Sequence, residues 1–85
     1  MLKNAADLVA FRENIGLTQA QLAARLGMHS RTYQELEAGK SKLRDVHALA
    51  IERIALDVAL ETGDPMKAPA EVRRLALDLA RLITG

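Results

Sequence analysis

Four glycines divide the chain, and each follows a stretch of residues that favour a helix. A glycine placed just after a helix takes up the left-handed conformation at little cost and closes the last turn. The positions of these glycines predict four helices. The first begins near residue 4 and ends at Gly16, and the second begins near residue 18 and ends at Gly27. The third begins near residue 29 or 30 and ends at Gly39, and the fourth begins near residue 44 or 45 and ends at Gly63. A chain divided in this way is expected to pack short helices together.

The start of the second helix carries the sharpest local signal in the sequence. Thr18 and Gln21 have the spacing of a capping box, in which each side chain accepts a hydrogen bond from the backbone of the other residue. Leu17 and Leu22 occupy the two positions of the hydrophobic staple that often accompanies it. We therefore expect a helix that runs to about Leu26.

A fifth helix is predicted after the turn at residues 63–65. Pro69 suits the first helical position, and Glu71 lies in the first turn, where a negative charge is favourable. The apolar residues that follow recur at helical spacing and form a stripe: Val72, Leu75, Ala76, Leu79, Leu82 and Ile83. A helix with such a stripe is weak alone in water, so the stripe must pack against another surface.

The composition agrees with an all-α fold of five helices. Ala and Leu supply 29 of the 42 apolar residues, whereas Val and Ile, which favour strands, supply eight. A chain of 85 residues allows one small domain, which we expect to span residues 1–85. Because the chain has no cysteine, it can form no disulfide, thiolate zinc site or cysteine nucleophile.

The net charge of +1 is unevenly distributed. Residues 1–44 hold seven Lys and Arg against four Asp and Glu, whereas residues 45–85 hold five against seven. The halves therefore differ in sign, which indicates different tasks. No apolar run approaches the roughly 20 residues of a membrane span. The N-terminus lacks the pattern of a secretory signal, so we expect a cytoplasmic protein that does not bind membranes.

Two short helices joined through Gly27 and Met28 suggest a helix-turn-helix. The segments Leu17–Ala23, Leu26–Met28 and Leu36–Ser41 resemble the phage-repressor/Cro type of helix-turn-helix regulator, also called the xenobiotic-response-element type. The resemblance covers about residues 5–56 and implies a repressor-like DNA-binding domain. We place the DNA-binding part at about residues 4–56.

The resemblance also implies how the third helix works. Arg12 and Glu37 are expected to form a partly buried pair that joins the first helix to the end of the third. The alternative is a solvated pair that contributes little to stability. The third helix would lie in the major groove of double-stranded DNA. Tyr33 and Leu36 would face the core. The residues expected at bases are Ser30, Arg31, Thr32, Gln34 and Glu35.

Two of these base-contact predictions have a specific chemical basis. The guanidinium of Arg31 can donate two hydrogen bonds to a guanine. Glu35 can accept from a cytosine amino group, or it can pair with Arg31 one helical turn away. A carboxylate at this position would also repel phosphates.

Contacts to the DNA backbone are expected at either end of the helix pair. Gln19 lies at the start of the second helix, and the resemblance implies that it holds a phosphate and braces the third helix at Ser30. The loop after the third helix supplies the remaining candidates: Lys40, Ser41, Lys42 and Arg44. The alternative is a basic loop that is merely solvated. His29 stands where the family often has a capping Ser or Thr, so Ser30 is an alternative cap.

No metal site, cofactor site or catalytic constellation is predicted. His29 and His47 are the only histidines, and no third ligand stands at a matching spacing. We therefore expect a binding protein and not an enzyme.

The C-terminal part is predicted to make a homodimer. The fourth helix is apolar over a wider arc than one core needs. Together with the stripe on the fifth helix, it suggests dimerisation helices at about residues 45–84, with the interface residues Leu56, Leu60, Val72, Leu75, Leu79, Leu82 and Ile83. The alternative is a fifth helix that folds back and completes a single core.

These features predict a sequence-specific transcriptional regulator, in the simplest case a dimeric repressor of a palindromic operator. A two-fold dimer would place its two reading helices about 34–36 Å apart, which is one turn of DNA. The alternative is an antitoxin or another protein-binding module with the same domain, whose partner would be a protein such as a toxin. The small net charge argues against a protein that coats DNA without specificity.

Overall fold

A computed structural model describes residues 2–85 and contains no strand over that range. The predicted all-α fold with five α-helices is confirmed. The elements in chain order are α1 (Ala5–Ile15), α2 (Gln19–Leu26), α3 (Ser30–Glu37), α4 (Asp45–Thr62), the short 3₁₀ turn η1 (Pro65–Lys67) and α5 (Ala70–Thr84).

The helix boundaries follow from local hydrogen bonds. The Asn4 side chain accepts from the Asp7 N–H at 2.9 Å and caps α1. Both bonds of the capping box are present, since the Gln21 N–H donates to Thr18 Oγ1 and the Thr18 N–H donates to Gln21 Oε1. Gly27 has a φ of +70°, which lets the chain leave α2 and enter α3 within a few residues.

The start of α5 differs from the prediction. The helix begins at Ala70, and Pro69 is the residue before it, with an extended backbone at φ −64° and ψ 156°. The 3₁₀ turn η1, which continues the turn predicted at residues 63–65 as far as Lys67, explains the shift. The Asp64 side chain accepts from the Met66 N–H at 3.0 Å and starts this turn, after which Ala68 and Pro69 run extended into α5.

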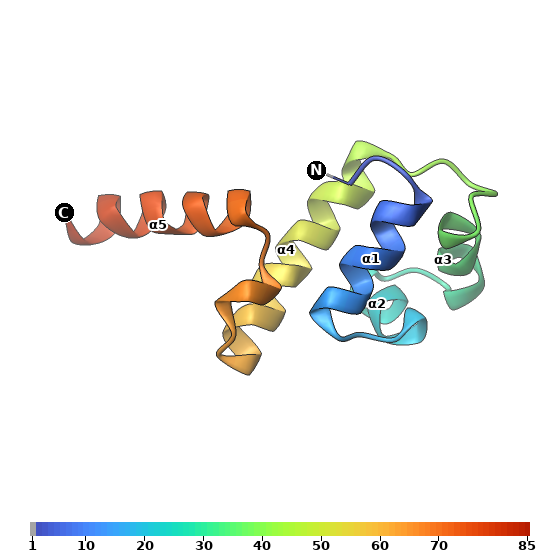
Figure 1. Cartoon of the computed structure of the whole chain (residues 1–85), viewed down its shortest axis with the longest axis horizontal. Coiled ribbons are helices and arrows are strands. Elements are labelled where there is room, and N and C mark those ends of the chain that lie inside the picture. The colour runs from blue at the N-terminus through green and yellow to red at the C-terminus, as the bar shows by residue number, and fades with distance from the viewer. Residues whose placement is uncertain (1) are drawn as a thin grey trace.

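Helices α1 to α4 enclose the hydrophobic core (Figure 1). The largest side chains with almost no exposed surface are Leu8, Ile15, Leu22, Tyr33 and Ile51. Each such aliphatic side chain stabilises the fold by roughly 1.5–3 kcal/mol when it leaves water. α4 spans this core along its length, so α1, α2 and α3 are held as one unit.

α5 is an arm that projects away from this core (Figure 1). None of its residues is buried, and Leu82 and Ile83 keep 83% and 75% of their surface exposed. The molecule accordingly measures 46 Å along its longest axis but only 22 and 20 Å along the others. The alternative in which the fifth helix folds back to complete the core is therefore not the observed arrangement.

The base of the arm is attached to α1 through η1. Lys67 Nζ donates to the backbone oxygen of Asn14 at 3.2 Å, near the C-terminal end of α1. Ala68, the residue directly after η1, is 2% exposed. Within residues 2–85, no helix has both the length and the apolar character needed to cross a bilayer.

Candidate nucleic-acid interface

α2 and α3 form a helix pair around the turn at residues 27–29. The Met28 N–H donates to the Ala23 oxygen at 2.9 Å, which closes α2 as the chain turns toward α3. Tyr33 and Leu36 are 0% and 2% exposed and anchor the inner face of α3 in the core. The opposite face of α3 is consequently presented to solvent.

The outer face of α3 carries the side chains predicted to meet bases. Arg31, Thr32 and Gln34 are exposed, and Ser30 and Glu35 are partly exposed. Within residues 2–85, no ion pair joins Arg31 to Glu35, so the structure lacks the alternative in which these two charges satisfy each other. A guanidinium and a carboxylate are thus both available to a ligand on this face.

The loop after α3 holds the candidate phosphate contacts beside that face. Lys40, Ser41, Lys42 and Arg44 are all exposed. The backbone N–H groups of Lys40 and Ser41 donate to the Glu35 oxygen at 3.0 and 3.3 Å, which holds the start of the loop against the end of α3. Leu43, partly buried against the core, anchors its far end.

A hydrogen-bonded network at the end of α3 joins three helices. The Glu37 carboxylate accepts from Arg12 Nε at 2.6 Å, from Arg12 Nη2 at 3.1 Å and from Gln19 Nε2 at 3.0 Å. The Tyr33 hydroxyl donates to the same carboxylate. The side chains of Arg12 and Glu37 are 16% and 5% exposed. Four donors satisfy the acceptor capacity of one carboxylate, so the charge is accommodated despite its burial.

The network shifts the ionisation of its members. Burial opposes ionisation of Glu37, but the hydrogen bonds from Arg12, Tyr33 and Gln19 outweigh it and hold the pKa of this carboxyl below its usual value. Burial, together with the bond to Glu37, raises the pKa of the Tyr33 hydroxyl. The hydrogen bond to Glu37 raises the pKa of Arg12. The network therefore remains an ion pair with a neutral phenol at physiological pH.

One prediction about the helix pair is wrong in detail, and one alternative is decided. Gln19 donates to Glu37 and not to Ser30, so it braces the end of α3 instead of its start. A hydrogen bond to a charged acceptor is stronger than one to a neutral hydroxyl, which explains the preference. Of the two alternatives for the cap of α3, His29 is the one observed, and its Nδ1 accepts from the Arg31 N–H at 3.3 Å.

Two residues make hydrogen bonds near the site that were not predicted from the sequence. Tyr33 was assigned only to the core, although its position one turn before Glu37 could have indicated the hydroxyl contact. His47 accepts from the Arg44 N–H at 3.0 Å and so helps to start α4 directly after the basic loop. Its position three residues after the cap is the spacing of the returning member of a capping box.

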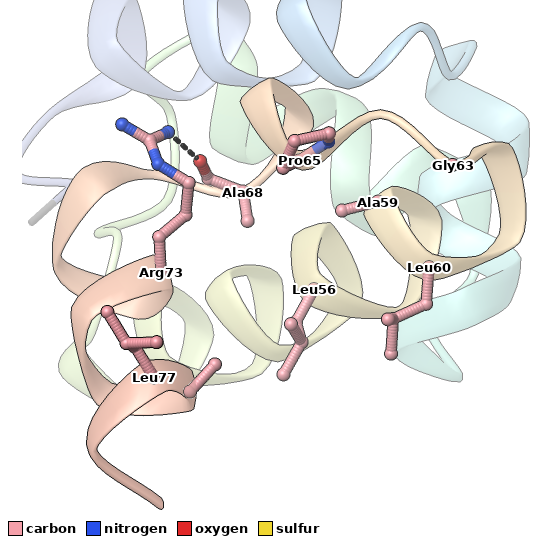
Figure 2. Close-up of a pocket in the computed structure, with 9 residues that line it drawn as sticks. Leu56, Ala59, Leu60, Gly63, Pro65, Ala68, Arg73 and Leu77 are labelled. Atoms are coloured by element: carbon pink, nitrogen blue, oxygen red, sulfur yellow. Dashed lines mark hydrogen bonds between the residues drawn. The ribbon is translucent and has the colours of Figure 1, made fainter. Parts of the chain in front are cut away.

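Five of the seven predicted dimer residues line two hollows between α4 and α5. Leu56, Val72, Leu75 and Leu79 line one groove of about 270 Å³ together with Leu49 of α4. Leu60 instead lines a second pocket of about 500 Å³, together with Leu56 of α4 and Leu77 of α5 (Figure 2). The remaining two predicted residues, Leu82 and Ile83, lie at the free end of α5.

Among the described residues 2–85, no group of three or more His, Cys, Asp or Glu side chains is arranged so that it could hold a metal ion. His29 and His47, the two histidines considered as ligands, each accept a backbone hydrogen bond at the start of a helix.

The buried inner face of α3, its polar outer face and the adjoining basic loop define a helix-turn-helix protein of the DNA-binding class. The comparison with protein families agrees. A family described as helix-turn-helix, of the phage-repressor/Cro type, matches residues 8–55, and the chain belongs to this family. It is therefore a DNA-binding transcription regulator. Comparison with curated proteins gave no match, and neither did comparison with solved structures.

Proposed function

We propose that the protein is a dimeric repressor that binds a palindromic operator and acts by binding and not by catalysis. The observation that carries this proposal is the exposed outer face of α3, with Arg31 at its start and the basic loop beyond its end. A planar guanidinium on the reading helix suits a guanine edge, and the loop cations suit phosphates. Such a protein would act in the cytoplasm, where it can reach DNA.

The proposed contacts divide into two kinds. Ser30, Arg31, Thr32, Gln34 and Glu35 would read bases. Gln19, Lys40, Ser41, Lys42 and Arg44 would hold the DNA backbone. Base contacts select the sequence, whereas backbone contacts set the register of the protein on the duplex.

The proposed homodimer rests on the unpartnered stripe of α5. Leu75 and Leu79 are 54% and 58% exposed, and Leu82 and Ile83 are exposed still further. Each of these side chains forgoes part of the roughly 1.5–3 kcal/mol that burial would contribute. An antiparallel second copy of α5 brings its own Leu82 and Ile83 to the groove beside Leu56, where the stripe begins. The occupant we propose for this groove is therefore the second copy.

In vitro selection of DNA sites tests the function directly. We expect an inverted repeat whose two halves are centred about one DNA turn, roughly 34–36 Å, apart. Selection of a single half-site would refute the dimer, and the absence of any enriched sequence would refute specific recognition. Leu79→Asp places a charge in the stripe and should produce a monomer in sedimentation, whereas Leu77→Asp, on the opposite side of α5, should leave the dimer intact.

A second candidate function is a protein-binding module such as an antitoxin. The pocket lined by Leu56, Leu60 and Leu77 favours it, because a dimer formed through the stripe leaves this pocket uncovered (Figure 2). The product of an adjacent gene, purified together with this protein, provides the test. Leu60→Asp should abolish co-purification and leave the dimer intact if the pocket receives such a partner.

A further inference from the structure

The direction of α5 is not set by a packed core. No residue of this helix is buried, and the pockets that it lines together with α4 include none of its residues beyond Leu79. Two extended residues, Ala68 and Pro69, lead from η1 into the helix. An amphipathic arm on a two-residue connection would swing freely unless that connection were restrained.

Three local features restrain the connection. The ring of Pro69 limits its own φ, here −64°, and disfavours a helical conformation at Ala68. Ala68 is 2% exposed and so is held by its neighbours. Arg73 Nη1 then reaches back from the end of the first turn of α5 and donates to the Ala68 oxygen at 2.6 Å (Figure 2).

The Arg73 bond is distinctive among the contacts of the arm. Within residues 2–85, it is the one side-chain hydrogen bond that joins α5 to the rest of the chain. The other charged contacts, Arg74 to Asp78 and Arg81 to Asp78, lie within the helix. On the other side of the connection, Lys67 holds η1 to the end of α1. Arg73 thus links the direction of the arm, through η1, to the helices that carry the DNA-reading face.

We propose that Arg73 is a positioning residue that sets the distance between the two half-sites the dimer accepts. The inference rests on the proposed dimer, in which the arms determine how the two reading helices are separated. A helix of 15 residues is about 22 Å long. A rotation of about 10° at its base moves its far end by about 4 Å, which is close to the rise of about 3.4 Å per base pair. A small change at Ala68 therefore corresponds to one base pair of half-site spacing.

Arg73→Met tests this role, because it keeps the aliphatic stem and removes the donor. Arg74→Met is the matched control, since Arg74 is adjacent, its side chain is 65% exposed, and its one ion pair within residues 2–85 is with Asp78. Arg73→Gln, whose shorter side chain cannot span the same gap, is a second variant in case Arg73→Met folds poorly. Each protein is given operators whose half-sites are separated by a series of spacings, and the relative affinities are measured.

A second readout follows the arm without DNA. Because the chain has no cysteine, Ala24→Cys and Arg81→Cys give two unique labelling sites, one on α2 and one on the arm. Electron spin resonance then reports the distribution of distances between labels within one chain, when the labelled protein is diluted with unlabelled protein.

We expect the wild-type protein and Arg74→Met to prefer one spacing about tenfold over its neighbours, and Arg73→Met and Arg73→Gln to prefer it less than threefold. The distance distribution should at least double in width in the two Arg73 variants alone. Unchanged spacing preference or unchanged width in both Arg73 variants would overturn the inference and leave the proposed function standing. Selection of isolated half-sites by the wild-type protein would overturn the dimer and this inference together.

Discussion

The Arg12–Glu37 pair offers the most direct test of how the DNA-reading helix is held. Arg12→Met keeps an unbranched side chain and removes both hydrogen bonds to Glu37. The Glu37 carboxylate, 5% exposed, would then remain in the interior with Gln19 and Tyr33 as its donors. Removing one member of a buried ion pair costs about 3–5 kcal/mol. Because two donors remain, we expect the free energy of unfolding to fall by about 3 kcal/mol, the lower end of this range.

Equilibrium unfolding in urea, followed by the helical circular dichroism signal, measures this loss. The midpoint should fall while the slope stays unchanged, since the same surface is exposed on unfolding. Arg25→Met is the control, because Arg25 also makes two hydrogen bonds to one carboxylate, at 2.8 and 2.7 Å, but its partner Glu61 is 52% exposed. Solvent screens that pair, so we expect only a small change in the midpoint.

The comparison between Arg12→Met and Arg25→Met shows whether the buried ion pair holds the DNA-reading helix in place. Arg12→Met should lower the free energy of unfolding more than Arg25→Met does. If the two losses are equal, the ion pair with Arg12 contributes no more to stability than an exposed ion pair, although Glu37 is buried. The reading helix would then be held by the packing of Tyr33 and Leu36 alone.

Three further predictions concern pH and DNA. The pKa of Glu37 is lowered on folding, so its stabilising effect is complete above the pKa of an unfolded glutamate and is lost as the pH falls through the lower folded value. Urea midpoints measured across this acid range should fall more steeply for the wild type than for Arg12→Met. Arg31→Ala should relax specificity at one base pair of each half-site by roughly 1–3 kcal/mol, as measured by site selection. Lys42→Ala should weaken all sequences alike and reduce the slope of log affinity against log salt by about one for each bound copy.

Each of these predictions has a contradicting outcome. Parallel pH profiles for the wild type and Arg12→Met would mean that the hydrogen bonds from Arg12 do not lower the pKa of Glu37. An unchanged preferred site in Arg31→Ala would remove Arg31 from base recognition. A Lys42→Ala protein that loses affinity for one sequence only would place Lys42 at a base and not at a phosphate.

The parts of the fold that were predictable depend on neighbours in sequence. The capping box of Thr18 and Gln21 and the closing turn at Gly27 involve residues within a few positions of each other, so the sequence alone specifies them. The inward face of α3 followed from helical spacing. These short-range rules are sufficient to locate α2, α3 and the surface between them.

The parts that were not predictable depend on distances between helices. From the sequence, Gln19 could donate to Ser30 at the start of α3 or to Glu37 at its end. Only the packing of α2 against α3 brings Glu37 within reach. The stripe of α5 likewise indicates that this helix must be covered, but not by what. Its direction arises from η1 and from the contact between Arg73 and Ala68, neither of which has a helical period in the sequence.

The small net charge of the chain makes DNA binding depend both on the surface of α3 and on the direction of α5. A net charge of +1 leaves little general attraction to DNA, so binding must depend on contacts placed at defined positions. One copy offers few such contacts. The contacts of both copies form together only if the distance between the two reading helices matches the distance between the half-sites of the operator. We therefore expect substitutions at the base of α5, which touches no base or phosphate in the proposed complex, to alter DNA binding as strongly as substitutions in the phosphate-contacting loop. They would do so by changing which operators fit, whereas loop substitutions would change how tightly every operator is held.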